Sequence, residues 1–569
     1  MYSYLPSEIN IFMDWAWSQI EPYYQNLESL PLDITSVDAW LRDWTRLGDL
    51  LIETHARLRA AVDLDTSDVQ AEKRYNAFLD GIYPASQAAN QRLKEKLLAS
   101  GLVPAGFEVP ISKIRLEAAL FHPENLSLLT QEHKLVSRYN KIIAEQTVVW
   151  NGQELTLQQL RQAGDNQDRP TRAKIWHLAA GRQLEDRPAL NRLWVEFMQL
   201  RTSLAHNSGE SSYLEFRWKQ MLRQDYSPAD CQEFQGAIER VVVPAAMRVY
   251  EKHRRRLALD SLHPWDLDQD LYPLEIPALP TYGSPSDLQD RCTNIFNNLD
   301  PQLAEYYRLM QGEGYLDLQN RKGKAPGGYC MGFPVTRRSF IFMNAVGRTS
   351  DVRTLLHESG HAFHNFERFK LPYMQQRIVG LEFAEVASMA MELLAYPFLS
   401  AEKGGFYDPS DLRRFQISHL EHILLFWPYM AVVDAFQHWV YTHQDLASDP
   451  ARCDQKWLEL WPRFFPGVDW SGLDIQAMTG WHRKQHIFRA PLYYVEYGLA
   501  QLGAVQVWRN SIQDPSGALN RYRFALSLGG TASLPDLYLA AGAKLAFDPQ
   551  TLGEAVNYIE AAIVDLEKE

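Results

Sequence analysis

The stretch Thr354-Leu-Leu-His-Glu-Ser-Gly-His-Ala-Phe-His-Asn-Phe366 decides how this chain is organised, because it holds the pattern H-E-x-x-H. It has the composition of a helix, and on a helix His357 and His361 lie about 40° apart in azimuth and about 6 Å apart along the axis. Both imidazoles can therefore reach one ion from one face. The sequence predicts a helix that carries two metal ligands.

Zinc chemistry gives Glu358 a separate role. A catalytic Zn²⁺ takes three protein ligands and keeps a fourth position for water. Glu358 follows His357 directly, so it turns away from the ligand axis but can lie beside that water and accept its proton. The pattern thus predicts two ligands and a general base, and it requires a third ligand from elsewhere.

The third ligand is expected on a second helix. In one known layout it is a third His that follows a Gly turn, but His364 and Glu367 occupy those Gly and His places here. Without that Gly the first helix can continue through Phe366. In the helical stretch 380–394, Glu385 and Glu392 are seven residues apart and share a face. We assign Glu385 as the third ligand and Glu392 as the partner of a ligand imidazole.

The stretches 351–364 and 383–388 resemble the catalytic signature of the thimet oligopeptidase and oligoendopeptidase F family of zinc metallopeptidases, most closely its Pz-peptidase-like branch. The likeness runs from about residue 200 to the C-terminus and includes 321–329, 340–344 and 486–497. It implies a deep channel between two helical lobes, which admits oligopeptides and excludes folded proteins. It also implies that a His and tyrosines from 486–497 face the metal.

Peptide hydrolysis needs hydrogen-bond donors for the oxyanion that forms when water attacks the carbonyl. His486, Tyr493 and Tyr497 are the candidates, since the two tyrosines are four apart on a helix expected to start at Pro491. Tyr494 could replace Tyr493 in this role. The alternative is that this aromatic cluster is packing.

One stretch beside the motif is typical of a β-strand. Residues 339–345 follow a Gly-rich segment, and the two together have the composition of a loop that leads into a short strand. A strand beside a zinc helix can offer its open edge to an extended peptide, which would make Asn344 and Ala345 substrate-binding positions. The alternative is a buried strand without substrate contact.

Elsewhere helical periods dominate. Stripes of apolar residues in 37–62, 68–98, 133–146 and 169–205 predict helices, and prolines between 264 and 285 indicate a loop region. We expect a mainly α protein with a small β-element beside the zinc helix. It would have an N-terminal helical lobe, 1–200, and a catalytic region, 201–569, packed as one compact unit.

Composition limits the partners. A net charge of −13 over 569 residues offers no basic face for nucleic acid. No apolar stretch is long enough for a membrane span, and residues 1–25 lack the basic start of a signal peptide. Four scattered cysteines indicate free thiols in a reducing compartment, and we expect a cytoplasmic protein. Cys330, in a Gly-rich loop, is either reactive or merely packed.

These observations predict a zinc endopeptidase with one Zn²⁺ per chain, acting on oligopeptides. A zinc exopeptidase is the alternative among enzymes, but it would need a charged clamp for a substrate terminus, which the sequence does not reveal. A catalytically silent helical protein with a structural metal is the alternative outside enzymes. The presence of Glu358 argues against it, because a structural zinc has no use for a base. The oligomeric state cannot be predicted.

Overall fold

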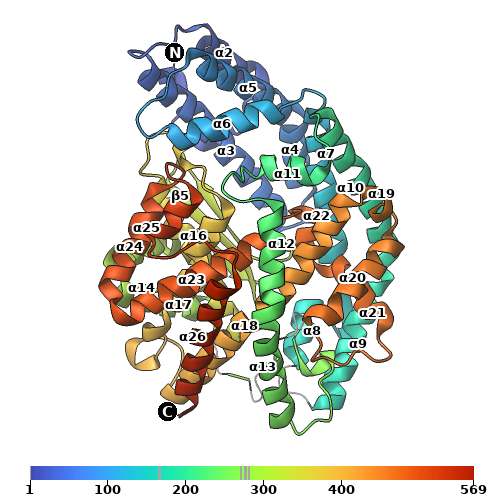
Figure 1. The fold of residues 1–569 in the computed structure, drawn as a ribbon. Coiled ribbons are helices and arrows are strands. Elements are labelled where there is room, and N and C mark those ends of the chain that lie inside the picture. Colours follow the sequence, from blue (N-terminus) through green and yellow to red (C-terminus); the bar gives the residue numbers. More distant parts are fainter. Residues whose placement is uncertain (1, 165–167, 269–271, 275–277, 280–281, 569) are drawn as a thin grey trace.

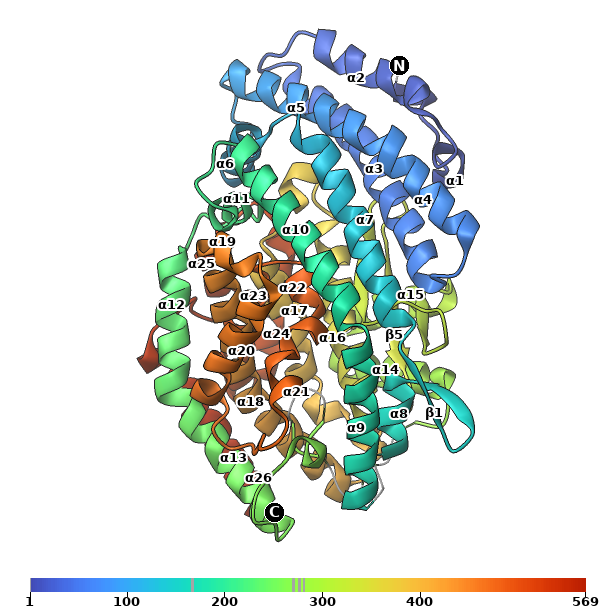
Figure 2. The same ribbon diagram turned by 90° about the vertical axis from the view of Figure 1, so that its right-hand side faces the viewer.

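A computed structural model describes residues 2–164, 168–268, 272–274, 278–279 and 282–568. The protein is mainly helical, as predicted, and its helices form an elongated body with the N-terminal helices at one end and the C-terminal helix at the other (Figures 1 and 2). Part of the proline-rich stretch 264–285 lies outside the described residues.

The first half of the chain is a succession of helices interrupted by one hairpin. Its elements are α1 (Ile9–Phe12), α2 (Trp17–Ser29), α3 (Val37–Leu64), α4 (Val69–Gly81), α5 (Tyr83–Ser100), α6 (Glu108–Leu120), α7 (Asn125–Ala144), β1 (Thr147–Trp150), β2 (Gln153–Thr156), α8 (Leu157–Gly164), α9 (Arg169–Glu185), α10 (Arg187–Asn207), α11 (Tyr213–Gln220), α12 (Pro228–Ala237) and α13 (Val243–Arg256).

The second half contains a small sheet and the helices that surround it. Its elements are α14 (Pro285–Leu299), α15 (Pro301–Gly312), β3 (Leu316–Gln319), β4 (Tyr329–Phe333), β5 (Arg338–Ala345), α16 (Thr349–Arg368), α17 (Leu381–Leu394), α18 (Pro409–Thr442), α19 (Gln444–Ala447), α20 (Pro450–Phe464), α21 (Asp474–Met478), α22 (Gln485–Arg489), α23 (Val495–Gln513), α24 (Pro515–Leu528), α25 (Leu534–Ala540) and α26 (Pro549–Lys568). Short 3₁₀ turns and one π-helical turn, Ile238–Val242, connect some of them.

Prolines set helix boundaries that the apolar stripes did not reveal. The stripe in 68–98 is divided at Ile82 into α4 and α5, and Pro84 stands in the first turn of α5. The stripe in 169–205 is likewise divided at Asp186, with Pro188 in the first turn of α10. Proline is tolerated there because the first-turn N–H groups have no intrahelical partner.

The sheet beside α16 has three strands in the order β3-β5-β4. β5 pairs in parallel with β3, where Leu316 faces Ile341, and antiparallel with β4, where Tyr329 faces Phe342. The strand expected at 339–345 is therefore present, but its predicted open edge is wrong, because β5 lies in the middle of the sheet. β3 and β4 were missed because the strands are short and flanked by turn-forming residues.

The two largest apolar cores among the described residues occupy different parts of the chain. One gathers side chains from the first helices, between Tyr2 and Ile114, together with Tyr373. The larger one gathers side chains from Leu120 to Ile563 and includes the apolar faces of α16, α17, α18 and α23. The proposed division at residue 200 remains a prediction.

The two helices that carry the predicted ligands meet at Gly360. A Cβ atom at this position would lie 2.5 Å from the Ala387 carbonyl oxygen and 2.6 Å from Ser388 Cα. Both atoms belong to the backbone of α17, so a side chain could not be accommodated by rotamer changes alone. Only glycine allows α16 and α17 to approach this closely.

Gly360→Ala should therefore push α17 away from α16. We expect the free energy of unfolding to fall by about 1–3 kcal/mol, as for other overpacked cores, and zinc binding to weaken because Glu385 would retreat from the two histidines. Thermal unfolding and zinc titration measure both effects.

Gly181→Ala is the matched control. Gly181 lies within α9, and a Cβ there would meet nothing within 4 Å. Alanine favours helix over glycine by up to about 1 kcal/mol, so stability should be unchanged or slightly raised. Equal melting of the two variants would contradict the close-contact argument.

Candidate functional site

The three predicted ligands converge. His357 and His361 come from α16 and Glu385 from α17, and Glu385 Oε2 lies 3.3 Å from His357 Nε2 and 3.4 Å from His361 Nε2. The three ligand atoms all lie within 4.8 Å of one another. Two imidazole nitrogens and one carboxylate oxygen at this spacing fit a catalytic Zn²⁺, which leaves its fourth position open.

Glu385 is held in place by two donors. The Tyr493 hydroxyl donates to Oε1, and Ser388 Oγ, one turn further along α17, donates to Oε2 at 3.0 Å. Burial alone would raise the pKa of Glu385, but His361 and His357 outweigh it and hold the pKa well below the usual range. The ligand therefore stays ionised in a buried position.

A chain of hydrogen bonds begins at Nδ1 of His357, the ring nitrogen that does not face the other two ligand atoms. Glu392 Oε1 accepts from His357 Nδ1 at 2.7 Å, and its Oε2 lies 3.0 Å from His419 Nε2. The Tyr396 hydroxyl lies 2.8 Å from His419 Nδ1. Because Nδ1 of His357 is occupied in this way, Nε2 is left with its lone pair toward the ligand cluster.

Glu392 thus lies where the sequence placed it, beside a ligand imidazole. Burial would raise its pKa, but the hydrogen bonds from His357 and His419 lower it to about 2. His419 and Tyr396 were missed by the sequence reasoning. His419 lies on α18, far from the motif in sequence, and no local pattern marks it.

Glu358 faces the ligand cluster from a buried position. Its Oε2 has no hydrogen-bond partner among the described residues. Burial raises the pKa of the Glu358 carboxyl, while the neighbouring histidines His357 and His361 oppose that rise. A Cβ at Gly328 would lie only 3.4 Å from Glu358 Oε1, so the Gly-rich loop before β4 passes directly against the carboxylate.

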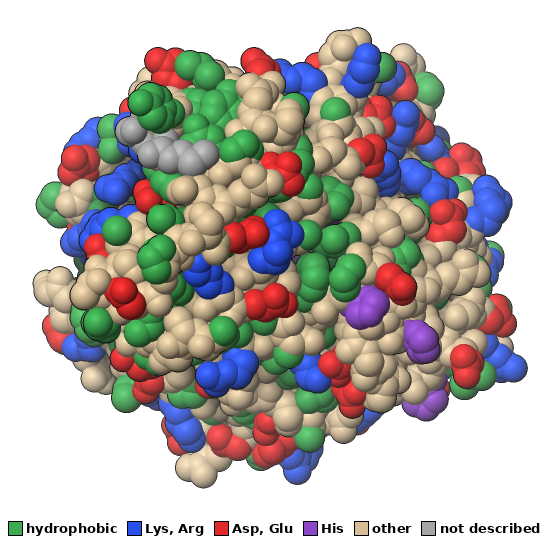
Figure 3. Space-filling view, turned by 90° about the horizontal axis from the view of Figure 1, so that it is seen from above, with side chains coloured by type: hydrophobic (Ala, Val, Ile, Leu, Met, Phe, Trp, Pro, Cys, Tyr) green, Lys and Arg blue, Asp and Glu red, His purple; other side chains and the backbone are tan. Residues whose placement is uncertain are grey.

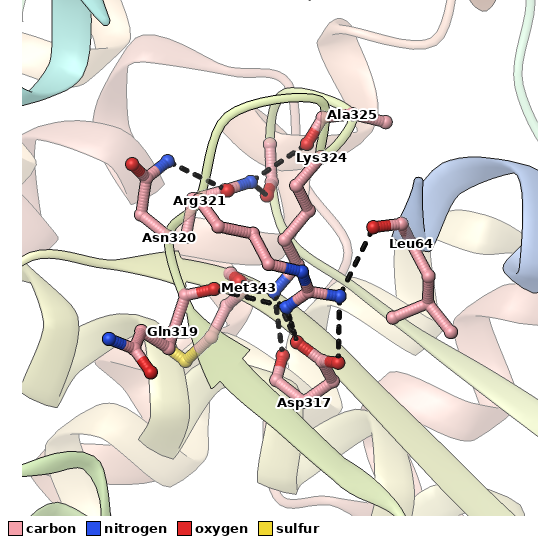
Figure 4. Close-up of polar contacts among 10 residues, drawn as sticks. Leu64, Asp317, Gln319, Asn320, Arg321, Lys324, Ala325 and Met343 are labelled. Carbon is pink, nitrogen blue, oxygen red and sulfur yellow. Dashed lines mark hydrogen bonds and ion pairs between the residues drawn. The ribbon is translucent and has the colours of Figure 1, made fainter. Parts of the chain in front are cut away.

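That loop, residues 320–328, is fixed by the buried ammonium of Lys324 (Figure 4). Lys324 Nζ donates to Asp317 Oδ1 at 2.6 Å, to the Gln319 carbonyl at 3.0 Å and to the Met343 carbonyl at 2.5 Å. Arg321 donates to both Asp317 oxygens and to the Leu64 carbonyl of α3. The loop is therefore tied to β3, β5 and an N-terminal helix.

Asn344 has a similar supporting role. Its Nδ2 donates to the carbonyls of Ala325 and Gly327, each at 2.9 Å, and its Oδ1 accepts from Asn320 Nδ2. Ala345 is buried, and its carbonyl accepts from the Asn320 backbone N–H. Asn344 also borders the cavities described below. As substrate-binding positions both residues remain predictions, although the open strand edge that suggested them is absent.

His486, Tyr493 and Tyr497 form one aromatic cluster. His486 Nε2 lies 3.3 Å from the Tyr497 hydroxyl, and the rings of Tyr493 and Tyr497 are 5.1 Å apart. The helix expected from Pro491 begins only at Val495, because Leu492 adopts a left-handed backbone conformation with φ of 61°. Tyr493 therefore precedes the helix, and its hydroxyl turns to Glu385.

Burial shapes the proton affinity of this cluster. It raises the pKa of the Tyr497 and Tyr493 hydroxyls well above 10 and lowers the pKa of His486 well below 6.5. At neutral pH the tyrosines are protonated donors and His486 is a neutral imidazole. Nδ1 of His486 has no hydrogen-bond partner among the described residues.

Two adjoining cavities lead to these residues. One, of about 490 Å³, is bordered by His357, Glu358, His486, Tyr494 and Tyr497. The other, of about 350 Å³, extends toward α7, α8 and α10. Both are bordered by Gln158, Arg161, Gly327, Asn344 and His486, so the two cavities adjoin, and together they are called the channel.

The four cysteines are unpaired, as predicted. Cys330 lies near Glu358, and its Sγ is 3.6 Å from Asn365 Nδ2. Burial raises the pKa of its thiol well above the usual range. A thiol that stays protonated is a weak nucleophile, which favours the packed alternative for Cys330.

On the face seen from above, acidic and basic side chains are intermingled (Figure 3). Among the described residues, no helix has the length and apolar character needed to span a bilayer.

Comparison with known proteins gives consistent results. The sequence profile of peptidase family M3 matches residues 163–554. Oligopeptidase PepF of Bacillus subtilis (strain 168) is 23% identical over 337 residues, which are 57% of this chain and 47% of that protein. An oligoendopeptidase F homolog of Borreliella burgdorferi is 18% identical over 336 residues, 57% of this chain and 54% of that protein. The matches thus span about half the length of these curated relatives.

Solved structures share the fold over the whole chain. Pz peptidase A with an inhibitor superposes with a TM-score of 0.92 at 24% identity, covering 99% of each chain. A putative oligoendopeptidase F from Bacillus anthracis superposes with a TM-score of 0.86 at 22% identity, covering 97% of each chain. At these identities the likeness establishes the fold.

The hydrogen bonds around the ligands predict graded losses of zinc. Glu392→Ala should weaken zinc binding by roughly 10–100-fold, as is usual when the partner of a ligand imidazole is removed. His419→Ala should act in the same direction but less strongly, because it touches only Glu392. Glu385→Ala should weaken binding more than either. Competition with a chromogenic chelator measures all three.

The order of these losses is the test. If Glu392→Ala emptied the site while Glu385→Ala kept its zinc, the two carboxylates would have to exchange roles. Glu313→Ala is a suitable control, since that carboxylate pairs with Arg338 and borders neither the ligand cluster nor its cavity.

Proposed function

The chain belongs to peptidase family M3, and from this membership we propose that it is a zinc-dependent endopeptidase that hydrolyses internal bonds of short peptides. The observation that carries the proposal is the convergence of His357, His361 and Glu385 beside the buried, unpartnered carboxylate of Glu358. This arrangement combines a three-ligand site with a base, at the wall of a channel.

The metal requirement follows from the donor set. His357 and His361 would hold Zn²⁺ through Nε2 and Glu385 through Oε2. When bound, Zn²⁺ supplies Lewis-acid chemistry, which activates water and polarises the scissile carbonyl. Glu392 keeps His357 in the correct tautomer, and Tyr493 keeps Glu385 oriented.

Glu358 is proposed to move the protons. It accepts the proton of the attacking water and later delivers it to the departing amine. Burial suits both steps, because it raises the pKa of the carboxyl and so strengthens the base. Gly328 leaves the space beside Glu358 Oε1 free of a side chain, so a water molecule or a peptide can approach.

His486 and Tyr497 are proposed to donate to the oxyanion. Both border the cavity that contains Glu358, whereas Tyr493 is engaged by Glu385. Tyr494 also borders this cavity and is a further candidate. The structure therefore favours Tyr497 over Tyr493 as the phenol that meets the substrate.

Three cations that border the second cavity are paired with carboxylates of the chain itself, so these three do not offer a clamp for a substrate carboxylate, in keeping with an endopeptidase. Lys324 and Arg321 pair with Asp317, and Arg187 pairs with Asp454. A channel that continues past the ligand cluster would let both ends of a peptide extend. We propose oligopeptides as substrates, with Asn344 and Ala345 on the substrate side, and a cytoplasmic location.

Quenched peptides of graded length, assayed with and without a chelator, test the proposal. We expect cleavage at internal bonds, loss of cleavage with the chelator and recovery with added Zn²⁺. Release of terminal residues one or two at a time would indicate an exopeptidase. A folded, zinc-loaded protein without hydrolysis of any peptide would indicate a silent scaffold.

Glu358→Gln should keep the zinc and lose turnover, because the amide preserves shape and removes the base. The measurements are zinc content by elemental analysis and kcat with a quenched peptide. Near-normal hydrolysis by the zinc-loaded variant would rule out Glu358 as the base.

Tyr497→Phe should lower kcat by about 10²-fold with KM nearly unchanged, as expected for a donor that acts in the transition state. Tyr493→Phe should instead weaken zinc retention, because Glu385 would lose a donor. Measuring kcat, KM, zinc affinity and melting for Phe variants at 493, 494 and 497 separates these roles. If all three retain turnover within a factor of about two, the tyrosines are packing.

A further inference from the structure

A second group of metal-ligating side chains lies away from the channel, between α12 and α18. Cys231 comes from α12, and Asp434 and His438 come from α18. Figure 1 shows α12 in green crossing the orange helices of the C-terminal half, and contacts join it to α18. The three ligand atoms lie within 4.8 Å of one another, and all three residues are buried, with exposures of 0%, 0% and 5%.

Two of these residues have the same spacing on their helix as His357 and His361 have on α16. Asp434 and His438 are four residues apart on α18, so both side chains leave the same face one turn apart. Cys231 and Gln235 are four apart on α12, and Gln235 Nε2 donates to Asp434 Oδ2 at 2.6 Å. Two adjacent helices thus each direct two polar side chains to one point.

These buried atoms lack the hydrogen bonds that burial demands. Asp434 Oδ1 and both ring nitrogens of His438 have no partner within the described part of the chain. Leaving such groups unpaired in an apolar interior destabilises the fold. An occupant that binds all of them at once would remove this penalty.

The distances distinguish a metal site from an ordinary ion pair. His438 Nε2 and Asp434 Oδ2 are 3.6 Å apart, beyond a hydrogen bond. Buried His–carboxylate pairs elsewhere in this chain are closer, at 2.8 Å for His253 with Glu421 and 3.0 Å for His419 with Glu392.

The catalytic ligand pairs show the longer spacing. Their N–O separations are 3.3 and 3.4 Å. Two ligands bound at about 2.0–2.2 Å in a tetrahedral arrangement are about 3.4 Å apart. The separation of 3.6 Å in the Asp434–His438 pair therefore matches two ligands of one ion better than two hydrogen-bonded groups.

We propose that Cys231, Asp434 and His438 bind a second divalent transition-metal ion, for which Zn²⁺ is best suited. On binding, the Cys231 thiol releases its proton to solvent, and the thiolate and carboxylate together balance the two positive charges. Rotating the Gln235 amide by half a turn would present its oxygen as a fourth donor. Thiolate, imidazole and carboxylate are all common ligands of zinc.

The site is structural rather than catalytic. None of the three ligands borders the channel residues, and their burial leaves no open position for a substrate. The ion would join α12 to α18, two elements that belong to different halves of the chain. It uses none of the residues of the proposed peptidase site, so the two proposals stand or fall separately.

Cobalt substitution tests the proposal directly. Co²⁺ bound to a thiolate gives an intense near-ultraviolet absorption band, whereas the catalytic set of two histidines and one glutamate has no thiolate. Metal-free protein titrated with Co²⁺ should bind two ions per chain and develop the band with one of them. Glu385→Gln should keep the band and bind one ion.

Cys231→Ser should lose the absorption band and bind one Co²⁺ ion per chain. Cys330→Ser, which removes the thiol near Glu358, is the control and should keep the band and bind two ions. Circular dichroism confirms that each variant folds. If Cys231→Ser does not fold, the number of bound ions and the absorption band of the wild type and of Glu385→Gln still test the proposal. Absence of the band in wild type, one ion per chain, or a band that persists in Cys231→Ser would overturn the proposal and indicate a cluster that holds water or nothing.

Discussion

The close approach of α16 and α17 at Gly360 is the constraint on which the rest of the structure depends. Zinc needs three donors at one point, and the motif supplies two of them from a single helix face. The third must come from a helix whose backbone nearly touches the first. Gly360 makes that possible by leaving no side chain between them, and Ala387 and Ser388 occupy the space. A local choice of residue therefore determines a tertiary contact.

A buried arginine, Arg223, links α17 to α23, the helix that carries Tyr497. Arg223 Nη2 donates to Glu496 Oε1 at 2.7 Å, and its Nε lies 3.5 Å from Glu382 Oε1, which also accepts from the Tyr226 hydroxyl at 2.6 Å. Glu382 is one turn before Glu385 on α17, and Glu496 is next to Tyr497 on α23. Removing one partner of such a buried network typically costs about 3–5 kcal/mol. The network therefore couples α17, which carries Glu385, to α23, which carries Tyr497.

The extent to which the sequence predicted the site follows from how local each signal is. The sequence predicted the positions of His357, Glu358 and His361 because one helix turn fixes their geometry. It predicted Glu385 and Glu392 because two residues seven apart on a helix share a face. The fold class followed from helical periods. The start of the helix that carries Tyr497 was predicted too early, at Pro491 instead of Val495, because no sequence pattern marks the left-handed backbone of Leu492. The strand edge was wrong, because pairing partners are chosen by tertiary packing, which a period of two does not specify.

Interactions between distant segments account for what was missed. His419 reaches Glu392 from α18, and Lys324 fixes the loop against Met343 through hydrogen bonds to backbone carbonyls. Neither depends on a pattern in its own neighbourhood. The cluster of Cys231, Asp434 and His438 is the clearest instance, since a lone cysteine and an i, i+4 pair on another helix carry little information separately. They become a candidate metal site only when folding brings α12 against α18. Metal binding there would therefore depend on the packing of these two helices.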